Sequence, residues 1–91
     1  MTLKRCLVAC DSDSGVRLCE VELAPEASIA DALCAARAQL GSEGIDWAGG
    51  ATGIYGRRRP REHVPGEGER VELYRPLRLD PRERRRQRTR R

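Results

Sequence analysis

The chain has 91 residues, of which 38% are hydrophobic and 35% are charged, so it has room for a single hydrophobic core. No apolar run approaches the roughly 18 residues that a membrane-spanning helix requires. The first residues also lack the apolar segment and the small-residue cleavage site of a secretory signal. We therefore expect no membrane insertion and a cytoplasmic location.

The positive charge is confined to one end of the chain. The formal net charge is +4, but residues 1–81 hold 11 basic and 13 acidic side chains, whereas residues 82–91 hold seven arginines and one glutamate. Residues 1–81 thus carry a net charge of −2 and residues 82–91 one of +6. This separation predicts an acidic folded core followed by a basic segment. We predict one folded domain over residues 1–78 and a disordered arginine-rich tail over residues 79–91.

The four cysteines, Cys6, Cys10, Cys19 and Cys34, do not have the spacing of a redox pair or of a zinc site. Free cysteine behaves as a small apolar residue and is often buried. We therefore expect all four to lie in the core, with no disulfide, no metal and no cofactor.

Two strands are expected first. Residues 3–10 are apolar and weakly alternating, residues 11–15 are turn formers, and residues 16–23 end with Cys19, Val21 and Leu23 on one face and two glutamates on the other. This pattern predicts a hairpin whose second strand has one solvated face.

A helix is expected next. Ser28 and Asp31 have the spacing of a capping box, and Gly41 stands where a helix would end. Between them the apolar residues recur at helical spacing: Ile29, Leu33, Ala36 and Leu40. The helix should therefore pack one face against a sheet, with Asp31, Arg37 and Gln39 on its polar face.

The second half of the chain has weaker signals. We expect residues 42–51 to form a loop in which Ile45 and Trp47 anchor the chain to the core; the alternative is that Trp47 faces a partner. Residues 52–56 resemble a short strand that residues 57–60 terminate, and residues 70–75 alternate as a last strand.

This order of elements predicts an α+β fold of the β-grasp, or ubiquitin-like, type. The last strand would pair parallel with the first inside a mixed sheet of four or five strands, with one helix across a face. A ferredoxin-like arrangement is the main rival, but it needs a second helix. Residues 42–64 have no helical apolar period that would supply one.

Residues 74–88 read Tyr-Arg-Pro-Leu-Arg-Leu-Asp-Pro-Arg-Glu-Arg-Arg-Arg-Gln-Arg. This segment resembles the end of the RnfH family of small bacterial ubiquitin-like proteins, in which Tyr-Arg-Pro-Leu and Asp-Pro-Lys/Arg-Glu precede an arginine run. Cys19–Leu23, the helix from Ser28 and Gly53–Gly56 are similar to the family's second strand, helix and third strand. Residues 57–67 depart from the pattern, because Val64 is their only apolar residue.

The resemblance implies a domain without known catalysis. The family is associated by gene neighbourhood with the Rnf electron-transport complex, and some members are described as antitoxins. Both roles would make a protein surface the working part. We therefore expect a monomeric protein-interaction module whose partner is a toxin, an electron-transport component or another protein.

The expected partner-binding residues lie on the last strands and beyond them. Sheet-face and edge residues would recognise the partner, and basic residues of the tail would steer its approach. The predicted contact residues are Tyr55, Tyr74, Arg75, Arg78, Asp80, Arg82, Arg84, Arg85 and Arg86.

Three other functions agree less well with the sequence. The tail arginines could neutralise phosphates of a nucleic acid, although the tail has no aromatic residue to stack on bases. A sulfur carrier or conjugated modifier would need a terminal Gly-Gly, which this chain does not have at residue 91. An ordinary enzyme is not expected, because the sequence has neither a phosphate-binding glycine loop nor a nucleophile with a helper base.

Overall fold

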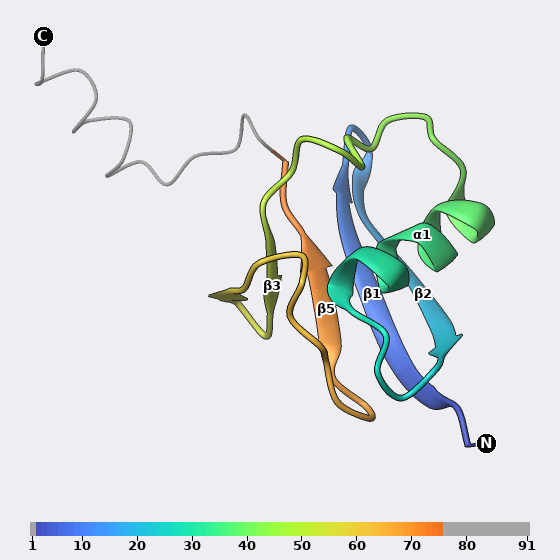
Figure 1. Cartoon of the computed structure of the whole chain (residues 1–91). Coiled ribbons are helices and arrows are strands. Elements are labelled where there is room, and N and C mark those ends of the chain that lie inside the picture. The colour runs from blue at the N-terminus through green and yellow to red at the C-terminus, as the bar shows by residue number, and fades with distance from the viewer. Residues whose placement is uncertain (1, 76–91) are drawn as a thin grey trace, which may run out of the picture.

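The computed structural model describes residues 2–75, which form a five-stranded mixed sheet with one helix. The strand order is β2-β1-β5-β3-β4, and α1 lies across one face of the sheet (Figure 1). The predicted β-grasp architecture is thereby confirmed. The expected domain boundary at residue 78 and the tail over residues 79–91 lie outside the described residues.

The chain begins with a long hairpin. β1 (Lys4–Ser12) pairs antiparallel with β2 (Gly15–Leu23) in an uninterrupted register that runs from Lys4–Leu23 to Ser12–Gly15. The hairpin was predicted, but both strands continue further toward the turn than the turn-forming sequence suggested. The reason is local, because the Ser12 hydroxyl donates to the Gly15 carbonyl at 2.5 Å and closes a tight turn.

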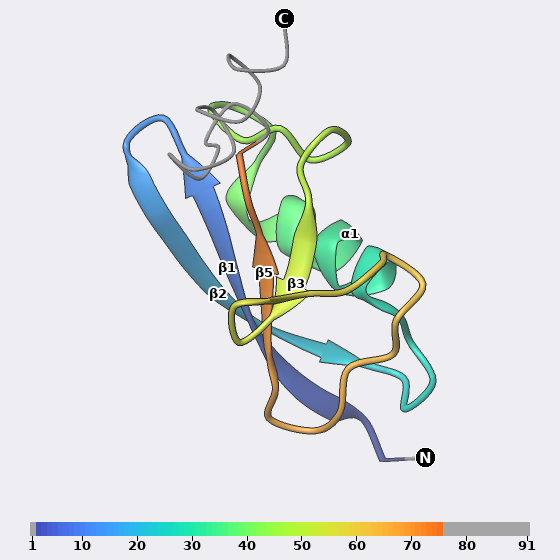
Figure 2. The same ribbon diagram turned by 90° about the vertical axis from the view of Figure 1, so that its left-hand side faces the viewer.

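Helix α1 (Ile29–Leu40) has the predicted ends. The Asp31 amide donates to the Ser28 hydroxyl at 3.3 Å, and the Asp31 carboxylate accepts from the Ser28 amide at 2.9 Å, so the capping box is formed. Gly41 follows with φ 83°, a conformation that favours glycine. Figure 2 shows the helix lying on one side of the sheet only.

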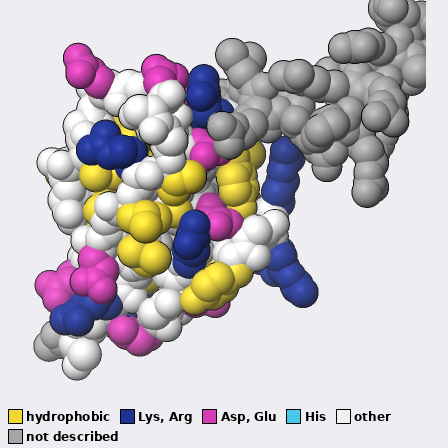
Figure 3. Space-filling model, turned by 180° about the vertical axis from the view of Figure 1, so that it is seen from behind, with side chains coloured by type: hydrophobic (Ala, Val, Ile, Leu, Met, Phe, Trp, Pro, Cys, Tyr) yellow, Lys and Arg dark blue, Asp and Glu magenta, His cyan; other side chains and the backbone are white. Residues whose placement is uncertain are grey.

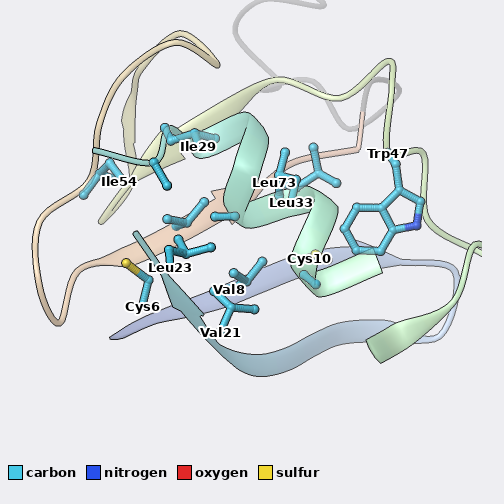
Figure 4. Close-up of a cluster of buried hydrophobic side chains, with 14 of the residues drawn as sticks. Cys6, Val8, Cys10, Val21, Leu23, Ile29, Leu33, Trp47, Ile54 and Leu73 are labelled. Atoms are coloured by element: carbon cyan, nitrogen blue, oxygen red, sulfur yellow. The ribbon is translucent and has the colours of Figure 1, made fainter. Parts of the chain in front are cut away.

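The core fills the space between α1 and the sheet (Figure 4). Val8, Val21 and Val71 come from three adjacent strands, and they meet Ile29 and Leu33 of the helix. The loop after α1 completes this core, since Trp47 is only 8% exposed and its indole N–H donates to the Gly41 carbonyl at 3.0 Å. Trp47 therefore anchors the loop, and the alternative that it faces a partner is wrong.

The remaining strands differ from the sequence prediction at one point. β3 (Thr52–Ile54) and β5 (Arg70–Leu73) pair antiparallel, and β5 pairs parallel with β1, as expected. However, Arg57–Arg58 do not simply end β3. They form a further short strand, β4, which pairs antiparallel with β3. A turn at Tyr55–Gly56 reverses the chain there, because both residues have positive φ, 49° and 80°.

Lys4 joins the start of β1 to two loops. Its side chain is buried, and its ammonium group donates to the carbonyls of Pro25, Ala27 and Pro65 at 2.9, 2.8 and 2.6 Å. A buried ammonium group is stable only when such acceptors surround it. Lys4 therefore fixes the loops that precede α1 and β5 against the sheet.

The cysteine prediction is confirmed for two residues and wrong for one. Cys6 and Cys10 are buried and Cys19 is half-buried, but Cys34 is exposed on α1. Cys34 lies outside the helical face formed by Ile29, Leu33 and Ala36, which explains its exposure. Within residues 2–75 no helix is long and apolar enough to cross a membrane, and no group of potential ligands is placed to hold a metal ion.

Candidate interaction surface

The sheet has one face that α1 does not cover, which we call the open face. Side chains alternate along each strand, so the residues between the core positions project onto it. The register brings together the outward residues of β2, β1 and β5 in rows. The open face is formed by Arg5, Leu7, Ala9, Asp11, Val16, Leu18, Glu20, Glu22, Tyr55, Arg70, Glu72 and Tyr74.

Several large apolar side chains on this face are in contact with solvent. Val16 is 56% exposed, Leu18 is 54% exposed and Tyr55 is 63% exposed. Figure 3 views the molecule from the side opposite to α1 and so looks onto the open face, where hydrophobic side chains lie with charged side chains between and around them. An apolar surface interspersed with polar groups is typical of protein-binding sites.

A polar network occupies the middle of the open face. The Glu72 carboxylate accepts hydrogen bonds from the Tyr74 hydroxyl at 2.6 Å, from the Gly56 amide at 2.5 Å and from Arg70 Nε at 3.1 Å. Glu72 thus links β5 to the turn between β3 and β4. Because three donors converge on one carboxylate, its orientation is fixed.

The network changes the ionisation of two of its members. Burial by itself would raise the pKa of Glu72, but the hydrogen bonds from Tyr74 and Gly56 and the charge of Arg70 lower it below its usual value. Burial, together with the bond to the Glu72 carboxylate, raises the pKa of Tyr74 to about 12. The network is therefore charged and intact at neutral pH.

Gly53 provides the space for this network. A Cβ atom at this position would collide with the Arg57 carbonyl and would lie 2.8 Å from the Tyr74 hydroxyl. Gly53 also pairs with Glu72 across the sheet. A side chain at position 53 would therefore displace the Tyr74 hydroxyl from Glu72.

The open face is hollowed beside the network. A cavity of about 120 Å³ is lined by residues of β1, β2 and β5 together with Tyr74. Ala9 forms part of its lining, and the half-exposed Val16 stands at its border. A cavity of this size fits a single small side chain of a partner, not a cofactor.

Tyr55 has an unusual backbone conformation. Its φ of 49° lies in the left-handed region, which costs a non-glycine residue about 1 kcal/mol or more. The hydroxyl donates to the Gly68 carbonyl at 3.1 Å, while most of the ring stays in solvent. A turn of this type favours asparagine followed by glycine; the bond to Gly68 offsets part of the strain, and the ring stays available for contact with a partner.

Three of the predicted contact residues fall within the described part of the chain. Tyr55 and Tyr74 lie on the same open face, on either side of Arg70 and Glu72. Arg75 follows β5 and forms an ion pair with Asp13 of the β1–β2 turn at 3.3 Å. The other predicted residues lie outside the described residues: Arg78, Asp80, Arg82, Arg84, Arg85 and Arg86.

A second feature was missed by the sequence interpretation. A wide hollow of about 400 Å³ lies along β3 and β4, and Arg58, Arg59 and Arg61 line it. The Arg61 guanidinium donates to the Gly50 carbonyl at 2.8 Å, which fixes its position. The arginine run at 57–59 was the signal for a basic surface, but we interpreted it only as the end of a strand.

The residues that distinguish the open face were only partly visible in the sequence. The alternation of Arg70, Glu72 and Tyr74 predicts that they share one face of β5. The participation of Gly56 and the need for glycine at position 53 were not predictable, because both depend on the β3–β4 turn.

Comparisons with known proteins agree with this architecture. The family described as "RnfH family Ubiquitin" matches residues 6–88. A Protein RnfH of Burkholderia mallei (strain NCTC 10229) is 39% identical over 77 residues, which are 81% of this chain and 70% of the relative. A UPF0125 protein of Xylella fastidiosa (strain 9a5c) is 41% identical over 73 residues, 80% of this chain and 85% of the relative.

A shorter segment is similar to a third relative. The Protein RnfH of Pseudomonas aeruginosa (strain LESB58) is 53% identical over 47 residues, which are 50% of this chain. The match spans 46% of the length of that relative.

Proposed function

Because the chain belongs to the RnfH family of ubiquitin-like proteins, we propose that it is a non-enzymatic protein-interaction module that binds a partner through the open face of its sheet. The observation that carries this proposal is the exposed, conformationally strained Tyr55 beside the fixed Arg70–Glu72–Tyr74 network. An aromatic anchor next to oriented polar groups is the usual composition of an energetic hot spot.

The physical argument rests on rigidity. Tyr55 is placed by a two-residue turn, and the Gly56 amide of that turn is bonded to Glu72. A partner that covers Tyr55 therefore orders few groups on this side of the interface, and the entropy cost of binding is reduced. Glu72 and Arg70 would give the contact its specificity, since an incorrect partner would leave their charges unpaired.

Two partner classes are proposed for RnfH proteins. We propose a cytoplasmic protein partner, either a toxin or an electron-transport component. The basic residues from Arg78 onward would accelerate the encounter with an acidic partner through long-range attraction.

A second candidate function is binding to nucleic acid. The hollow lined by Arg58, Arg59 and Arg61 favours it, because guanidinium groups pair well with phosphate oxygens. The seven arginines of residues 82–91 would extend the same basic character.

The test is affinity capture from native lysate treated with nuclease, at low and at high salt. The baits are the full-length chain and a version that ends at Pro81. Recovery of one protein by both baits after nuclease treatment supports the interaction module. Recovery that disappears with nuclease, with salt and with removal of the tail supports the nucleic-acid function instead.

A matched pair of variants locates the contact. Tyr55→Ser removes the exposed ring from the open face, whereas Val64→Ser removes an exposed apolar side chain, 49% accessible, from the loop between β4 and β5. We expect capture to fall at least roughly tenfold with Tyr55→Ser, the range of a hot-spot residue, and to persist with Val64→Ser. Equal capture by both variants would show that the open face near Tyr55 is not the contact.

A further inference from the structure

The two edges of the sheet differ in how well they are protected. β4 consists of two arginines, and a short, charged edge strand is poorly suited to pair with a further strand. β2 forms the other edge, has nine residues in unbroken register with β1, and contains no proline; its charged residues are Arg17, Glu20 and Glu22. Charged side chains protect an edge against indiscriminate pairing, so a strand added to β2 would have to complement these charges.

The register shows which backbone groups of β2 face outward. The Leu7 amide donates to the Glu69 carbonyl, on the side of β5, so Leu7 and its opposite residue Glu20 form a non-hydrogen-bonded pair. The amides and carbonyls of Val16, Leu18, Glu20 and Glu22 therefore point to the free edge. The Glu20 carbonyl confirms this direction, because it accepts a hydrogen bond from the exposed Gln39 side chain of α1 at 2.9 Å; an added strand would replace this contact, while the other outward groups need no such exchange.

The side chains of the same four residues lie on the open face and form two zones. Val16 and Leu18 are exposed and apolar. Glu20 and Glu22 are acidic; Arg5 lies 3.5 Å from Glu22, whereas Glu20 stands opposite the uncharged Leu7. An added strand would thus meet an apolar pair, then an uncompensated negative charge.

We propose that the free edge of β2 binds an extended segment of another protein by strand addition, with apolar residues opposite Val16 and Leu18 and a basic residue opposite Glu20. In an antiparallel partner strand, every second side chain faces these four residues. Read from the partner's N-terminus, the facing side chains are first basic and then apolar. The inference rests on the proposed interaction function and specifies one way in which the partner is held.

A second copy of this chain is a poorer occupant. Two β2 edges paired antiparallel with full overlap would place Leu18 against Glu20 and Val16 against Glu22, in both halves of the interface. Each pair would set a carboxylate against an aliphatic side chain, and in the Leu18–Glu20 pairs that carboxylate would have no opposite charge across the β1–β2 ladder. The segment 82–91 of this chain also lacks the required pattern, because it has arginines but no aliphatic residue.

The experiment is amide hydrogen exchange measured by NMR on the full-length chain. The probe is a synthetic peptide with arginine at its first and third positions, valine at its fifth and seventh, and threonine between them. We expect the peptide to slow exchange of the outward amides of Val16, Leu18, Glu20 and Glu22 at least roughly tenfold. The inward amides of Cys19 and Val21, which already bond to β1, are the internal control and should not change.

Two variants and one control peptide test the chemistry. A peptide with glutamate in place of arginine should bind roughly five- to tenfold more weakly, and Glu20→Arg should reverse this preference. Glu62→Arg makes the same charge change in the loop between β4 and β5 and should leave the preference unchanged. Leu18→Pro removes one outward amide, and should abolish binding while leaving the β1–β2 ladder in place.

Several results would overturn the proposal. Slowing that is equal for outward and inward amides, or absent with the arginine peptide, would exclude strand addition. If the outward amides are already protected from exchange in the free chain, the edge is already occupied. Protection that rises with protein concentration would identify a second copy as the occupant, and protection that does not would identify this chain's own residues. If Leu18→Pro still captures the cellular partner, the interaction function stands and the edge inference fails.

Discussion

Replacing Tyr74 by phenylalanine tests the polar network of the open face. The variant keeps the ring but removes the hydroxyl that donates to Glu72 at 2.6 Å. A hydrogen bond to a charged acceptor contributes about 1.5 to 3 kcal/mol. We therefore expect Tyr74→Phe to lower the free energy of unfolding by about 2 kcal/mol at pH 8.

The pKa of Tyr74 predicts how this difference depends on pH. Burial and then the bond to the Glu72 carboxylate raise the pKa of Tyr74 from 10.0 to about 12 on folding. Because the folded value is the higher one, this stability is fully present below pH 10 and is lost as pH rises through 12. The phenylalanine variant cannot lose it.

The assay is urea unfolding of both proteins between pH 8 and 12, followed by circular dichroism under reducing conditions. The difference between parent and variant should be about 2 kcal/mol at pH 8 and should shrink toward zero between pH 10 and 12. Other groups titrate in both proteins and cancel in the difference. A difference that is absent at pH 8, or constant up to pH 12, would refute the proposed network.

Four further changes have defined outcomes. The folded pKa of Glu72 is lowered, so the parent should lose stability as pH falls below about 4.5, and Glu72→Gln should not show this loss. Acid unfolding of both proteins measures the loss, and identical acid profiles would contradict the prediction. Lys4→Met should cost about 3 kcal/mol in urea unfolding because three loop carbonyls lose their donor, whereas an equally stable variant would mean that burial of the ammonium group outweighs its bonds. Leu33→Asp should leave no cooperative thermal transition, because it places an unpaired charge under α1; a melt like that of the parent would disprove the assigned helix face. Tyr55→Asn relieves the strain of tyrosine in the left-handed region but loses the hydrogen bond to the Gly68 carbonyl, so the free energy of unfolding should change by less than about 1 kcal/mol while partner capture falls. Lower stability with full capture would show that Tyr55 is only structural.

The local features of the fold could be predicted from the sequence. The capping box at Ser28 and Asp31 and the glycine at 41 define the helix, because their hydrogen bonds form within one turn of the chain. The alternation in residues 19–23 likewise assigns the buried face of β2. Together with the order of the elements, these signals were sufficient to predict the β-grasp architecture.

The fifth strand could not be predicted in the same way. Arg57–Arg58 have no apolar face that would indicate burial, and they form a strand only because the Tyr55–Gly56 turn returns the chain to β3. Tyrosine in a left-handed turn contradicts local preference, so the sequence favoured a strand that simply ended. The exposure of Cys34 was missed for a related reason, since residue type was given more weight than helical position.

The sequence by itself determined the helix, most of the strands, the class of fold and the separation of charge between residues 1–81 and 82–91, because each depends on residue type and short-range spacing. Only the tertiary structure decided how the open face is composed. The three donors around Glu72 come from β5, from the residue that follows it and from a turn 16 residues away in the sequence. The free edge of β2 exists because β5 occupies the other side of β1. Such contacts depend on strand pairing between distant segments, and no local pattern of residues encodes which edge is left without a partner.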